Sequence, residues 1–526
     1  MTGFFHQTLA QVLAQAEIPV DAQHDMPDVQ ITGVTYDSRL VRQGFIYIAQ
    51  TGATVDGHTF IAQAVKNGAV AVVGTQALNV AGAPYFQVED SRRVLALLSA
   101  AFYGFPARHL NVIGVTGTDG KTTTSNLIYQ ILIAAGTRVG IISTVNAVIG
   151  EEVVDTGLHV TTPEAPEVQR YLSRMLAAGL THVVLESTSH GLAQHRVTGC
   201  EFDIGVVTNI THEHLDYHGS YEAYRAAKAR LFTGLAETAT KEHGNPRLAV
   251  LNMDDASYEY LHSVVSVNQV GYSIRRRGEG VWAEEIRHDP SGCRFTACGP
   301  GFRFPVECKL VGDFNVSNCL AAICATVVGL GIAPEDAQRG IAALQGVSGR
   351  MENIKMGQTF TAIVDFAHTP NALRAALETA RQMTGGRVLA VFGSAGLRDR
   401  QKRRMMADVS LHIADVTYLT AEDPRTESLD EILAEMADAA CQAGGVEGKN
   451  FWRVPDRCEA IRKAIRAAQP GDLVISCGKG HDQSMCFGVE EYPWDDRTAL
   501  RAALAEALGV PGPAMPYLPT SIDSLK

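Results

Sequence analysis

The segment from Gly117 to Thr124, Gly-Thr-Asp-Gly-Lys-Thr-Thr-Thr, has the residue types that bind a nucleotide phosphate. Its glycines let the backbone approach an anion closely, and the amides at a helix start point toward such an anion. Lys121 would pair with the outer phosphates, and Thr122 or Thr123 would offer a hydroxyl to Mg²⁺. The spacing differs from the standard Walker A pattern, because Val115 stands where its first glycine is expected. An apolar run before the segment and a helical run after it favour nucleotide binding over an ordinary glycine-rich turn.

Two further polar groups follow expected strands. Glu186 ends an apolar run that begins at His182, and ligands of parallel sheets bind beyond the carboxyl ends of strands. An acid there suits Mg²⁺, which takes a few carboxylates together with phosphate oxygens. The segment Thr208–His218 has three histidines within seven residues but lacks the His-Glu-x-x-His spacing of zinc proteases. A solvated acid and locally hydrogen-bonded histidines are the alternatives. For Lys228, in a helical run, the pattern alone indicates a solvated lysine.

Composition limits the partners of this chain. It has 526 residues, 45 Lys plus Arg and 57 Asp plus Glu, and a formal net charge of −12. This balance argues against a general nucleic-acid binder. The first twenty residues lack a basic region with a long apolar core, and no stretch approaches the ~20 apolar residues of a membrane span. We therefore expect a soluble cytoplasmic protein with neither nucleic-acid nor membrane partners. Ten cysteines without a Cys-x-x-Cys pair indicate reduced, mostly buried thiols.

Alternating strand and helix patterns predict an α/β chain of three domains. Residues 1–92 contain short apolar runs typical of a small α/β domain of mixed strands. Residues 93–346 predict a mainly parallel sheet with helices on both faces. Within them, the short apolar runs broken by Gly and Pro in Gln269–Leu310 suggest antiparallel hairpins added to one edge. Residues 347–508 show a second doubly wound pattern. The Pro-rich tail, residues 509–526, is expected to be poorly ordered.

Apolar runs locate the expected strands of the two larger domains. In the central domain they are residues 110–115, 139–142, 182–185, 204–207 and 248–251. In the C-terminal domain they are residues 362–366, 387–392, 416–419 and 472–477. Helical periodicity separates these runs, as at Val168–Ala178, Tyr221–Phe232 and Pro370–Met383.

Further motifs follow the phosphate loop in a fixed order. They are Glu186–Val197, Thr208–Phe232, Gly349–Glu352, Val364–Leu373, Arg398–Arg403, Glu422–Glu427 and Gly478–Asp482, with Tyr36–Arg39 and Asp56–His58 near the N-terminus. Together they resemble the ATP-dependent Mur ligases, and in particular the branch that adds the third amino acid to UDP-N-acetylmuramoyl-dipeptide. The resemblance covers residues 30 to 500.

The resemblance implies a fold and a reaction. The fold has a UDP-binding domain, a central P-loop ATPase domain and a C-terminal Rossmann-like domain. The reaction converts the D-Glu carboxylate of UDP-N-acetylmuramoyl-L-Ala-D-Glu into an acyl phosphate with ATP, and the amine of a dibasic amino acid then displaces phosphate. Mg²⁺ is the implied cofactor, and the enzyme is expected to act as a monomer in peptidoglycan precursor synthesis.

The resemblance also implies roles for individual residues. The catalytic residues are Lys121, Glu186, His214 and Lys228, the last as a carbamylated lysine. The metal ligands are Thr122, Glu186, His214 and Lys228. ATP is bound by Gly117, Thr118, Asp119, Gly120, Lys121, Thr122, Thr123, Asn318, Arg350 and Asp365. UDP-N-acetylmuramoyl-dipeptide is bound by Tyr36, Ser38, Thr161, Thr162, Thr188, Gln194 and Arg196. The amino-acid substrate is bound by Arg398, Glu422, Asp423, Pro424, Arg425, Gly478 and Asp482, although the run 398–404 could instead be a solvated basic face.

The amino-acid motifs depart from the pattern of the diaminopimelate-adding enzymes. Those enzymes usually have Asp-Asn-Pro-Arg where this chain has Glu422-Asp423-Pro424-Arg425, and Glu where it has Asp482. Leu397 replaces a further carboxylate. Arg425 favours a substrate with a distal carboxylate, such as meso-diaminopimelate, whereas the other changes equally fit L-lysine or L-ornithine. The sequence leaves this choice open.

Three other functions remain alternatives at this point. One is a ligase like folylpolyglutamate synthetase, which Ser38 and Arg39 disfavour. Another is a catalytically silent nucleotide-binding protein, which the intact Lys121 and Glu186 disfavour. The third is a simple P-loop phosphotransferase, which would leave the C-terminal motifs without a role.

Overall fold

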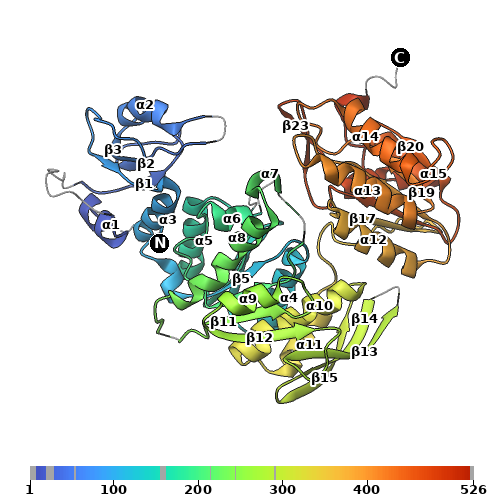
Figure 1. The fold of residues 1–526 in the computed structure, drawn as a ribbon, viewed down its shortest axis with the longest axis horizontal. Coiled ribbons are helices and arrows are strands. Elements are labelled where there is room, and N and C mark those ends of the chain that lie inside the picture. Colours follow the sequence, from blue (N-terminus) through green and yellow to red (C-terminus); the bar gives the residue numbers. More distant parts are fainter. Residues whose placement is uncertain are drawn as a thin grey trace.

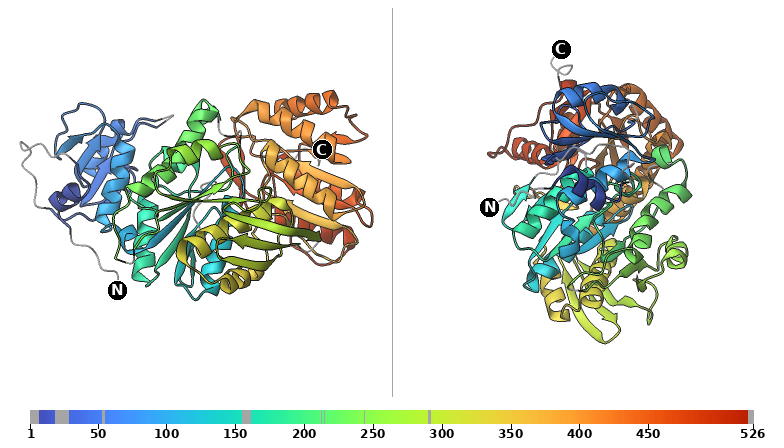
Figure 2. Two further views of the ribbon diagram at one scale, coloured as in Figure 1. Left: turned by 60° about the horizontal axis from the view of Figure 1, so that its bottom comes forward. Right: turned by 90° about the vertical axis from the view of Figure 1, so that its left-hand side faces the viewer.

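The computed structural model describes residues 7–18, 29–52, 55–154, 161–211, 213, 215–242, 244–289 and 292–521. These residues form three main sheets with four, eleven and six strands, and one separate two-stranded hairpin. Figure 1 shows the four-stranded sheet (blue) and the six-stranded sheet (orange to red) at opposite ends of the molecule, with the large sheet between them. In the left-hand view of Figure 2 the three parts again follow one another along the molecule. The expected three-part α/β architecture is confirmed.

The N-terminal part is a parallel sheet with the order β1-β2-β3-β4. The expectation of mixed strand directions is therefore wrong for its described strands. The elements are α1 (Leu9–Gln15), β1 (Gly33–Thr35), β2 (Phe45–Ile48), η1 (Gly57–Phe60), α2 (Ile61–Lys66), β3 (Ala69–Gly74), β4 (Tyr85–Gln87) and α3 (Ser91–Phe102). Asp90 begins α3 by accepting the amides of Arg92 and Arg93 at 2.9 and 3.0 Å.

The central part contains the eleven-stranded sheet, in the order β15-β14-β13-β12-β11-β10-β5-β9-β6-β7-β8. Its first elements are η2 (Pro106–His109), β5 (Asn111–Thr116), α4 (Lys121–Ala134), β6 (Val139–Ile142), β7 (Ala147–Ile149), β8 (Glu152–Val154), α5 (Ala165–Ala177), β9 (His182–Glu186), α6 (Ser189–Ala193) and β10 (Ile204–Val207). They are followed by α7 (Leu215–His218), α8 (Tyr221–Thr233), η3 (Gly234–Ala236), β11 (Leu248–Asn252), α9 (Tyr258–Val264), β12 (Asn268–Ser273), β13 (Val281–Asp289), β14 (Gly292–Gly299), β15 (Phe302–Cys308), α10 (Asp313–Ile323), η4 (Cys324–Val328) and α11 (Pro334–Ala343).

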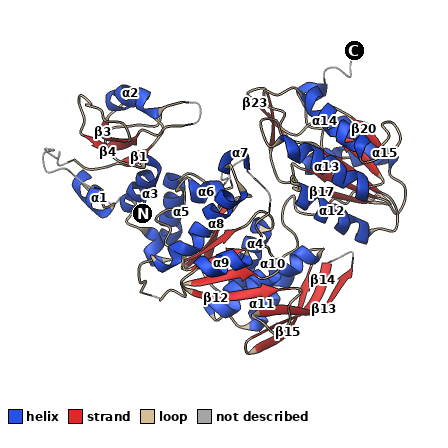
Figure 3. Cartoon of the chain, viewed as in Figure 1, coloured by secondary structure: helices blue, strands red, loops and turns tan. Residues whose placement is uncertain are grey.

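The middle strands of this sheet are covered on both faces. Helices α4, α10 and α11 pack on one face, and α5, α6 and α8 pack on the other, an arrangement visible in Figure 3. This explains why β10 is apolar and fully buried instead of alternating. Strands β13, β14 and β15 pair antiparallel, as expected for Gln269–Leu310, whereas β12 pairs parallel with both β11 and β13.

The C-terminal part has a sheet with the order β16-β17-β21-β18-β19-β20, parallel except at β16. Helices α12 to α14 cover one face, and α15 and α16 cover the other. The elements are β16 (Glu352–Asn353), β17 (Thr361–Asp365), α12 (Pro370–Met383), β18 (Val388–Phe392), α13 (Arg400–Ile413), β19 (Val416–Leu419), α14 (Leu429–Gln442), β20 (Phe451–Arg453), α15 (Arg457–Ala467), β21 (Leu473–Cys477), β22 (Ser484–Phe487), β23 (Glu490–Pro493) and α16 (Asp496–Leu508).

The tail after α16 folds back onto this part. Leu518 is fully buried in the core beneath α15 and α16, and the hydroxyls of Thr520 and Ser521 donate to Asp456 at 2.8 Å. The expectation of a poorly ordered tail is therefore wrong for its described residues, 509–521, because apolar burial and helix-cap contacts hold it. Within the described part of the chain, no helix has the length and apolar character needed to cross a membrane.

Candidate active site

The phosphate loop connects β5 to α4. Its first glycine, Gly117, has a φ of 151°, and a Cβ atom there would lie 1.8 Å from the hydroxyl oxygen of Thr208. A glycine is therefore required at this position. The amides of Thr118 and Asp119 donate to the carbonyl and side-chain oxygens of Asn209 at 2.8 and 3.0 Å. These contacts fix the loop against the segment that follows β10.

Lys121 is the first residue of α4, and its ammonium donates to the carbonyl oxygen of Thr118 at 2.9 Å. Burial lowers the pKa of Lys121, although the carboxylates of Glu186 and Asp119 act in the opposite direction. An anion bound at the start of α4 would oppose this lowering and would meet the positive end of the helix dipole. The loop thus has the geometry and charge of a phosphate site.

Two of the residues expected at the metal are in contact. The hydroxyl of Thr122 donates to Oε1 of Glu186 at 3.0 Å, and Oε2 of Glu186 accepts the amide of Thr144 at 3.0 Å. Glu186 is almost fully buried at the end of β9. Adjacent hydroxyl and carboxylate oxygens fit Mg²⁺, which completes its shell with phosphate oxygens and water. His214 lies outside the described residues, among which no group of three His, Cys, Asp or Glu side chains forms a metal-binding cluster.

Lys228 is buried on α8, with 1% of its surface exposed. Its ammonium donates to the carbonyl oxygen of Gly117 at 2.6 Å and lies 4.7 Å from the ring centre of Tyr224. Burial, followed by the nearby ammonium of Lys121, moves the pKa of Lys228 well below its usual value. The pattern-based interpretation of a solvated lysine is therefore wrong, and the side chain lies against the phosphate loop.

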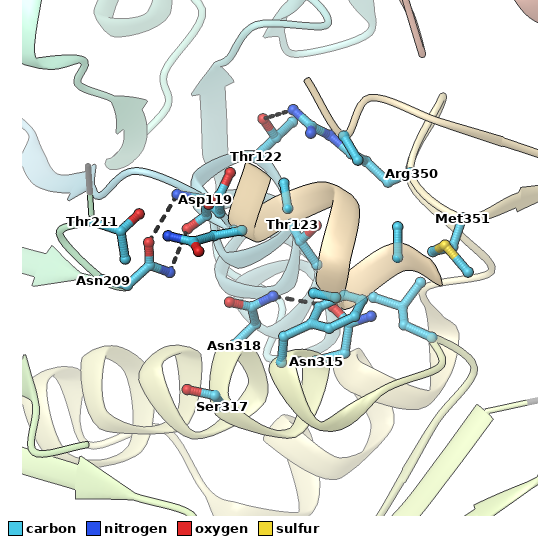
Figure 4. Close-up of a pocket in the computed structure, with 18 of the residues that line it drawn as sticks. Asp119, Thr122, Thr123, Asn209, Thr211, Asn315, Ser317, Asn318, Arg350 and Met351 are labelled. Carbon is cyan, nitrogen blue, oxygen red and sulfur yellow. Dashed lines mark hydrogen bonds between the residues drawn. The ribbon is translucent and has the colours of Figure 1, made fainter. Parts of the chain in front are cut away.

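A cavity of about 330 Å³ lies beside the phosphate loop. Figure 4 shows side chains of the loop and α4, of α10, and of the segment before β17 around it. Seven of the residues expected to bind ATP line it: Asp119, Gly120, Thr122, Thr123, Asn318, Arg350 and Asp365. Of the others, Thr118 and Lys121 line a neighbouring cavity, and the carbonyl of Gly117 faces Lys228.

Hydrogen bonds hold the far wall of this nucleotide cavity. Asn318 donates to Oδ1 of Asn315, one turn earlier on α10, at 3.1 Å. Asp365 ends β17 and accepts the amides of Met351 and Ala367 at 2.7 and 2.8 Å. These contacts leave an amide-rich wall on α10 and a carboxylate opposite it, groups that suit a purine base and a ribose.

Sequence reasoning missed several polar residues of the nucleotide cavity. Asn209, Asn252, Asp254 and Arg275 line it, and all of them lie at or just after the ends of the neighbouring strands β10, β11 and β12. The rule that ligands bind beyond the carboxyl ends of parallel strands could have identified them.

A second cavity, of about 230 Å³, joins the central and C-terminal parts; we call it the reaction cavity. From the central part it is lined by Thr118, Lys121, Thr144, Thr161, Glu186, Thr188 and Glu213. From the C-terminal part it is lined by residues that include His368, Arg398, Asp399, Lys402, Glu422, Asp423, Arg425, Gly478 and Asp482. Arg350 lines both cavities. The structure therefore brings residues expected at the phosphate, the metal and the amino acid around one space.

Three further residues expected to bind the UDP-linked dipeptide, Thr162, Gln194 and Arg196, form a network with Thr188 beside this cavity. The hydroxyls of Thr162 and Thr188 are 3.1 Å apart. Arg196 donates to the carbonyl of Thr162 at 2.9 Å and to Oε1 of Gln194 at 2.8 Å, and it pairs with Glu164 at 2.8 Å. Arg196 is thus held in place instead of being a free surface arginine.

Tyr36 connects this network to the N-terminal part. Burial, followed by the carboxylates of Glu164 and Glu167, raises the pKa of Tyr36 to about 12, and Arg196 acts against this rise. Tyr36 also lines a cavity of about 200 Å³ between β1 and α5. Ser38, expected beside it, is 9% exposed, and its carbonyl accepts the side-chain amide of Asn67 at 3.0 Å.

A buried lysine forms ion pairs with two acids of the motifs expected to bind the amino acid. The ammonium of Lys479 pairs with Asp423 at 3.0 Å and with Asp482 at 3.1 Å, and Lys479 is 1% exposed. Sequence reasoning quoted its motif but gave it no role. Pro424, expected to bind the amino acid, has its carbonyl oxygen close to Gly396, and this oxygen accepts the amide of Glu427 at 3.1 Å.

The basic residues of α13 lie in different environments: some form ion pairs within the protein, and one lines the reaction cavity. Arg403 is fully buried and donates to Glu427 at 2.6 Å, whereas Lys402 lines the reaction cavity. Arg400 is exposed and pairs with Glu435. The alternative of a uniformly solvated basic face is therefore wrong.

Comparisons with known proteins agree with this arrangement. Family models of the Mur ligase family catalytic domain, the Mur ligase middle domain and the Mur ligase glutamate ligase domain match residues 30–103, 115–326 and 349–480. The UDP-N-acetylmuramyl-tripeptide synthetase of Roseiflexus sp. (strain RS-1) is 43% identical, over 91% of this chain and 96% of its own. The UDP-N-acetylmuramoyl-L-alanyl-D-glutamate--2,6-diaminopimelate ligase of Geobacillus thermodenitrificans (strain NG80-2) is 42% identical, over 90% and 95%.

A solved structure supports the same assignment. The structure of a UDP-N-acetylmuramoyl-L-alanyl-D-glutamate--2,6-diaminopimelate ligase superposes with a TM-score of 0.66 and 30% identity, covering 96% of this chain and 99% of its own. The resemblance inferred from the motifs is confirmed. The chain belongs to the Mur ligase family.

Proposed function

We propose that this Mur ligase uses ATP to join the D-Glu carboxyl of UDP-N-acetylmuramoyl-L-Ala-D-Glu to the amine of a dibasic amino acid. The observation that carries the proposal is the reaction cavity, where Lys121 and Glu186 share one space with Arg398 and Arg425. The names of the relatives, a tripeptide synthetase and diaminopimelate ligases, support the same step. We further propose that the enzyme works in the cytoplasm as a monomer.

The first chemical step joins two anions. A carboxylate oxygen of the dipeptide attacks the γ-phosphorus of ATP, the bond from that phosphorus to the bridging oxygen breaks, and ADP leaves. Such a step depends on cancelling charge and aligning the reactants more than on a strong base. Lys121 at the phosphate loop and Arg350, which lines both cavities, have the position for this role.

The second step forms the amide. The amine of the amino acid adds to the acyl carbon, and the resulting tetrahedral intermediate loses phosphate. Arg398 and Arg425 suit the carboxylates of that amino acid, because guanidinium groups bind carboxylates in a bidentate manner. The acyl phosphate must be kept from water, and the position of the reaction cavity between two parts of the chain supports closure of those parts around the substrates.

Thr122 and Glu186 would hold a Mg²⁺ ion, with His214 and a carbamylated Lys228 as further ligands implied by the family. When bound, that ion would neutralise phosphate charge. Lys228 suits carbamylation, because its lowered pKa favours the neutral amine that adds to carbon dioxide. The carbamate would replace a buried cation by an anion beside Lys121.

The identity of the amino acid is the finer part of this proposal. Arg425 supports a substrate with a distal carboxylate, as in meso-diaminopimelate. The ion pairs of Lys479 with Asp423 and Asp482 engage both carboxylates inside the protein, which disfavours their use to bind the distal ammonium on which recognition of L-lysine or L-ornithine would depend. We therefore favour meso-diaminopimelate over L-lysine and L-ornithine.

Phosphate release tests the proposal. The enzyme is given ATP, UDP-N-acetylmuramoyl-dipeptide and one of meso-diaminopimelate, lysine, ornithine or diaminobutyrate. We expect phosphate release to require both the dipeptide and one of these amino acids. The amino acid that supports release identifies the third residue of the product. ATP hydrolysis independent of the dipeptide would instead favour a phosphotransferase. Nucleotide binding without phosphate release under any of these conditions would favour a catalytically silent nucleotide-binding protein, and activity with a folate substrate would favour the folylpolyglutamate alternative.

A further inference from the structure

Glu422 has an unusual environment in the reaction cavity. It follows β19, is 6% exposed, and its buried Oε2 atom has no hydrogen-bond partner among the described residues. A Cβ atom at position 478 would lie 2.4 Å from that oxygen, so Gly478 leaves the adjacent space open. A buried carboxylate oxygen without a partner is costly, and such a group in a substrate cavity indicates a ligand contact.

The other acids of the reaction cavity are already engaged. Glu186 accepts the hydroxyl of Thr122 and the amide of Thr144. Asp423 and Asp482 both pair with the Lys479 ammonium. The two remaining acids are also in contact with neighbours: Glu213 lies 3.7 Å from the ammonium of Lys402, and Asp399 accepts the amide of Gln401 at 2.9 Å.

We propose that Glu422 is the general base that removes a proton from the ammonium group of the incoming amino acid. The inference rests on the proposed function, because it requires an acyl phosphate that an amine attacks. The N–H bond of the ammonium breaks and its proton moves to Oε2 of Glu422. The neutral amine then forms the C–N bond with the acyl carbon. The bond from that carbon to the phosphate oxygen breaks, and the second proton of the nitrogen leaves with the phosphate as hydrogen phosphate.

The charges around Glu422 suit this role. Burial raises the pKa of Glu422 to about 7, although the cations Lys402 on α13, Arg457 on α15 and Lys479 after β21 act against it. Asp423 adds to the rise. A base with a pKa near the working pH is substantially ionised and yet accepts a proton readily, which is the optimum for general base catalysis.

The imidazole of His368 is the competing base in the reaction cavity. Its Nδ1 atom lies 3.0 Å from the carbonyl oxygen of Phe366, a contact in which Nδ1–H donates and Nε2 remains the acceptor. Burial, followed by the charge of Lys402, lowers the pKa of His368 well below its usual value. So weak a base takes a proton from an ammonium group less readily than Glu422 does.

Hydroxylamine separates this role from acyl-phosphate formation. It is uncharged near neutral pH, so it attacks an acyl phosphate without a base and gives a hydroxamate. The wild type and Glu422→Gln are each supplied with ATP, UDP-N-acetylmuramoyl-dipeptide and either the amino acid or hydroxylamine. We expect kcat for amide formation to fall by about 10² to 10⁴-fold in the variant, the usual contribution of a general base, while hydroxamate formation is unchanged. A wild type that makes no hydroxamate would refute the proposed function instead.

Three controls complete the test. Glu431→Gln removes the same charge from the exposed face of α14 and should leave both reactions unchanged. Glu422→Asp keeps the carboxyl group and should recover most of the amide rate. In the wild type itself, amide formation should fall as the pH is lowered below about 7, the titration of the base, while hydroxamate formation, divided by the fraction of hydroxylamine that remains unprotonated, stays level.

Specific results would overturn the assignment. A loss confined to KM for the amino acid would make Glu422 only a binding residue, and equal loss of amide and hydroxamate formation would mean that it acts before the acyl phosphate. An unchanged amide rate in Glu422→Gln would also refute it. If that variant does not fold, the wild-type pH profile decides: an amide rate that does not change as the pH is lowered below about 7 would refute Glu422 as the general base.

Discussion

The ammonium of Lys228 and the carbonyl oxygen of Gly117 are 2.6 Å apart, so a buried cation on α8 is hydrogen-bonded to the first glycine of the phosphate loop. The two residues are 111 positions apart in the sequence. The contact joins a helix that follows β10 to the loop that follows β5, and the two strands are neighbours in the sheet. A change to the charge on Lys228 therefore changes the electrostatic potential and the hydrogen bonding at the phosphate loop.

Lys228→Ala is expected to lower ATP-dependent amide formation by at least ~10²-fold, the scale for losing one preorganised charged group. If the wild-type side chain is a carbamate, formate or acetate added to the variant should restore part of the rate. The measurement is steady-state phosphate release with and without these acids. Arg230→Ala, which removes an exposed cation from the same helix, is the control. Full activity of Lys228→Ala without rescue would show that the lysine is only structural.

Lys121→Ala is expected to lower turnover by at least ~10²-fold, because the loop loses the charge that faces the outer phosphates. ATP binding should weaken as well. Phosphate release and nucleotide titration measure the two effects. Lys309→Ala removes an exposed lysine of the same part of the chain and should leave both unchanged. Turnover near that of the wild type in Lys121→Ala would contradict the phosphate assignment.

Glu422→Gln is expected to stabilise the folded chain above neutral pH. The pKa of Glu422 is raised from 4.5 to about 7 in the fold, so between these values the folded chain binds more protons than the unfolded chain. This group therefore makes the free energy of unfolding fall as the pH rises through that window. Glutamine does not titrate, so the stability of the variant relative to the wild type should be greater at about pH 8 than at about pH 5. Urea denaturation at both values measures it, and an equal difference at both would contradict the raised pKa.

Asp496→Ala is expected to destabilise the C-terminal part by about 3–5 kcal/mol, the cost of leaving one partner of a buried ion pair alone. Both Arg457 and Asp496 have fully buried side chains, 2.6 Å apart. Arg457 also donates to the carbonyls of Ala421 and Cys477 at 3.1 and 2.8 Å, which directly precede two residues of the reaction cavity. Denaturant unfolding measures the loss, with the exposed Asp430→Ala as control. A change below about 1 kcal/mol, the range of an exposed pair, would contradict the contribution of this pair.

The order of strands and helices was predictable because the larger sheets are buried on both faces. A run such as Ile204–Val207 is apolar at each position and fully buried in the structure. The hairpin β22–β23 was not predictable, because its second strand, Glu490–Pro493, is mostly exposed and has no apolar periodicity. The burial of Leu518 also depends on packing between distant segments, which a Pro-rich composition does not reveal.

The site was predictable where chemistry depends on local spacing. The glycines and lysine of the phosphate loop form one continuous segment, and Glu186 ends an apolar run. The burial of Lys228 and the double ion pair of Lys479 arise from tertiary contacts between segments far apart in the sequence. Nothing in the residue spacing around either lysine indicates such partners.

Transfer of labelled oxygen tests the central claim most directly. The dipeptide substrate is prepared with ¹⁸O in the D-Glu side-chain carboxyl, and the phosphate released during ligation is examined by mass spectrometry. If the carboxylate attacks the γ-phosphorus to give an acyl phosphate, the phosphate carries one ¹⁸O atom from the substrate. Phosphate that contains no ¹⁸O while the amide product accumulates would contradict the acyl-phosphate mechanism.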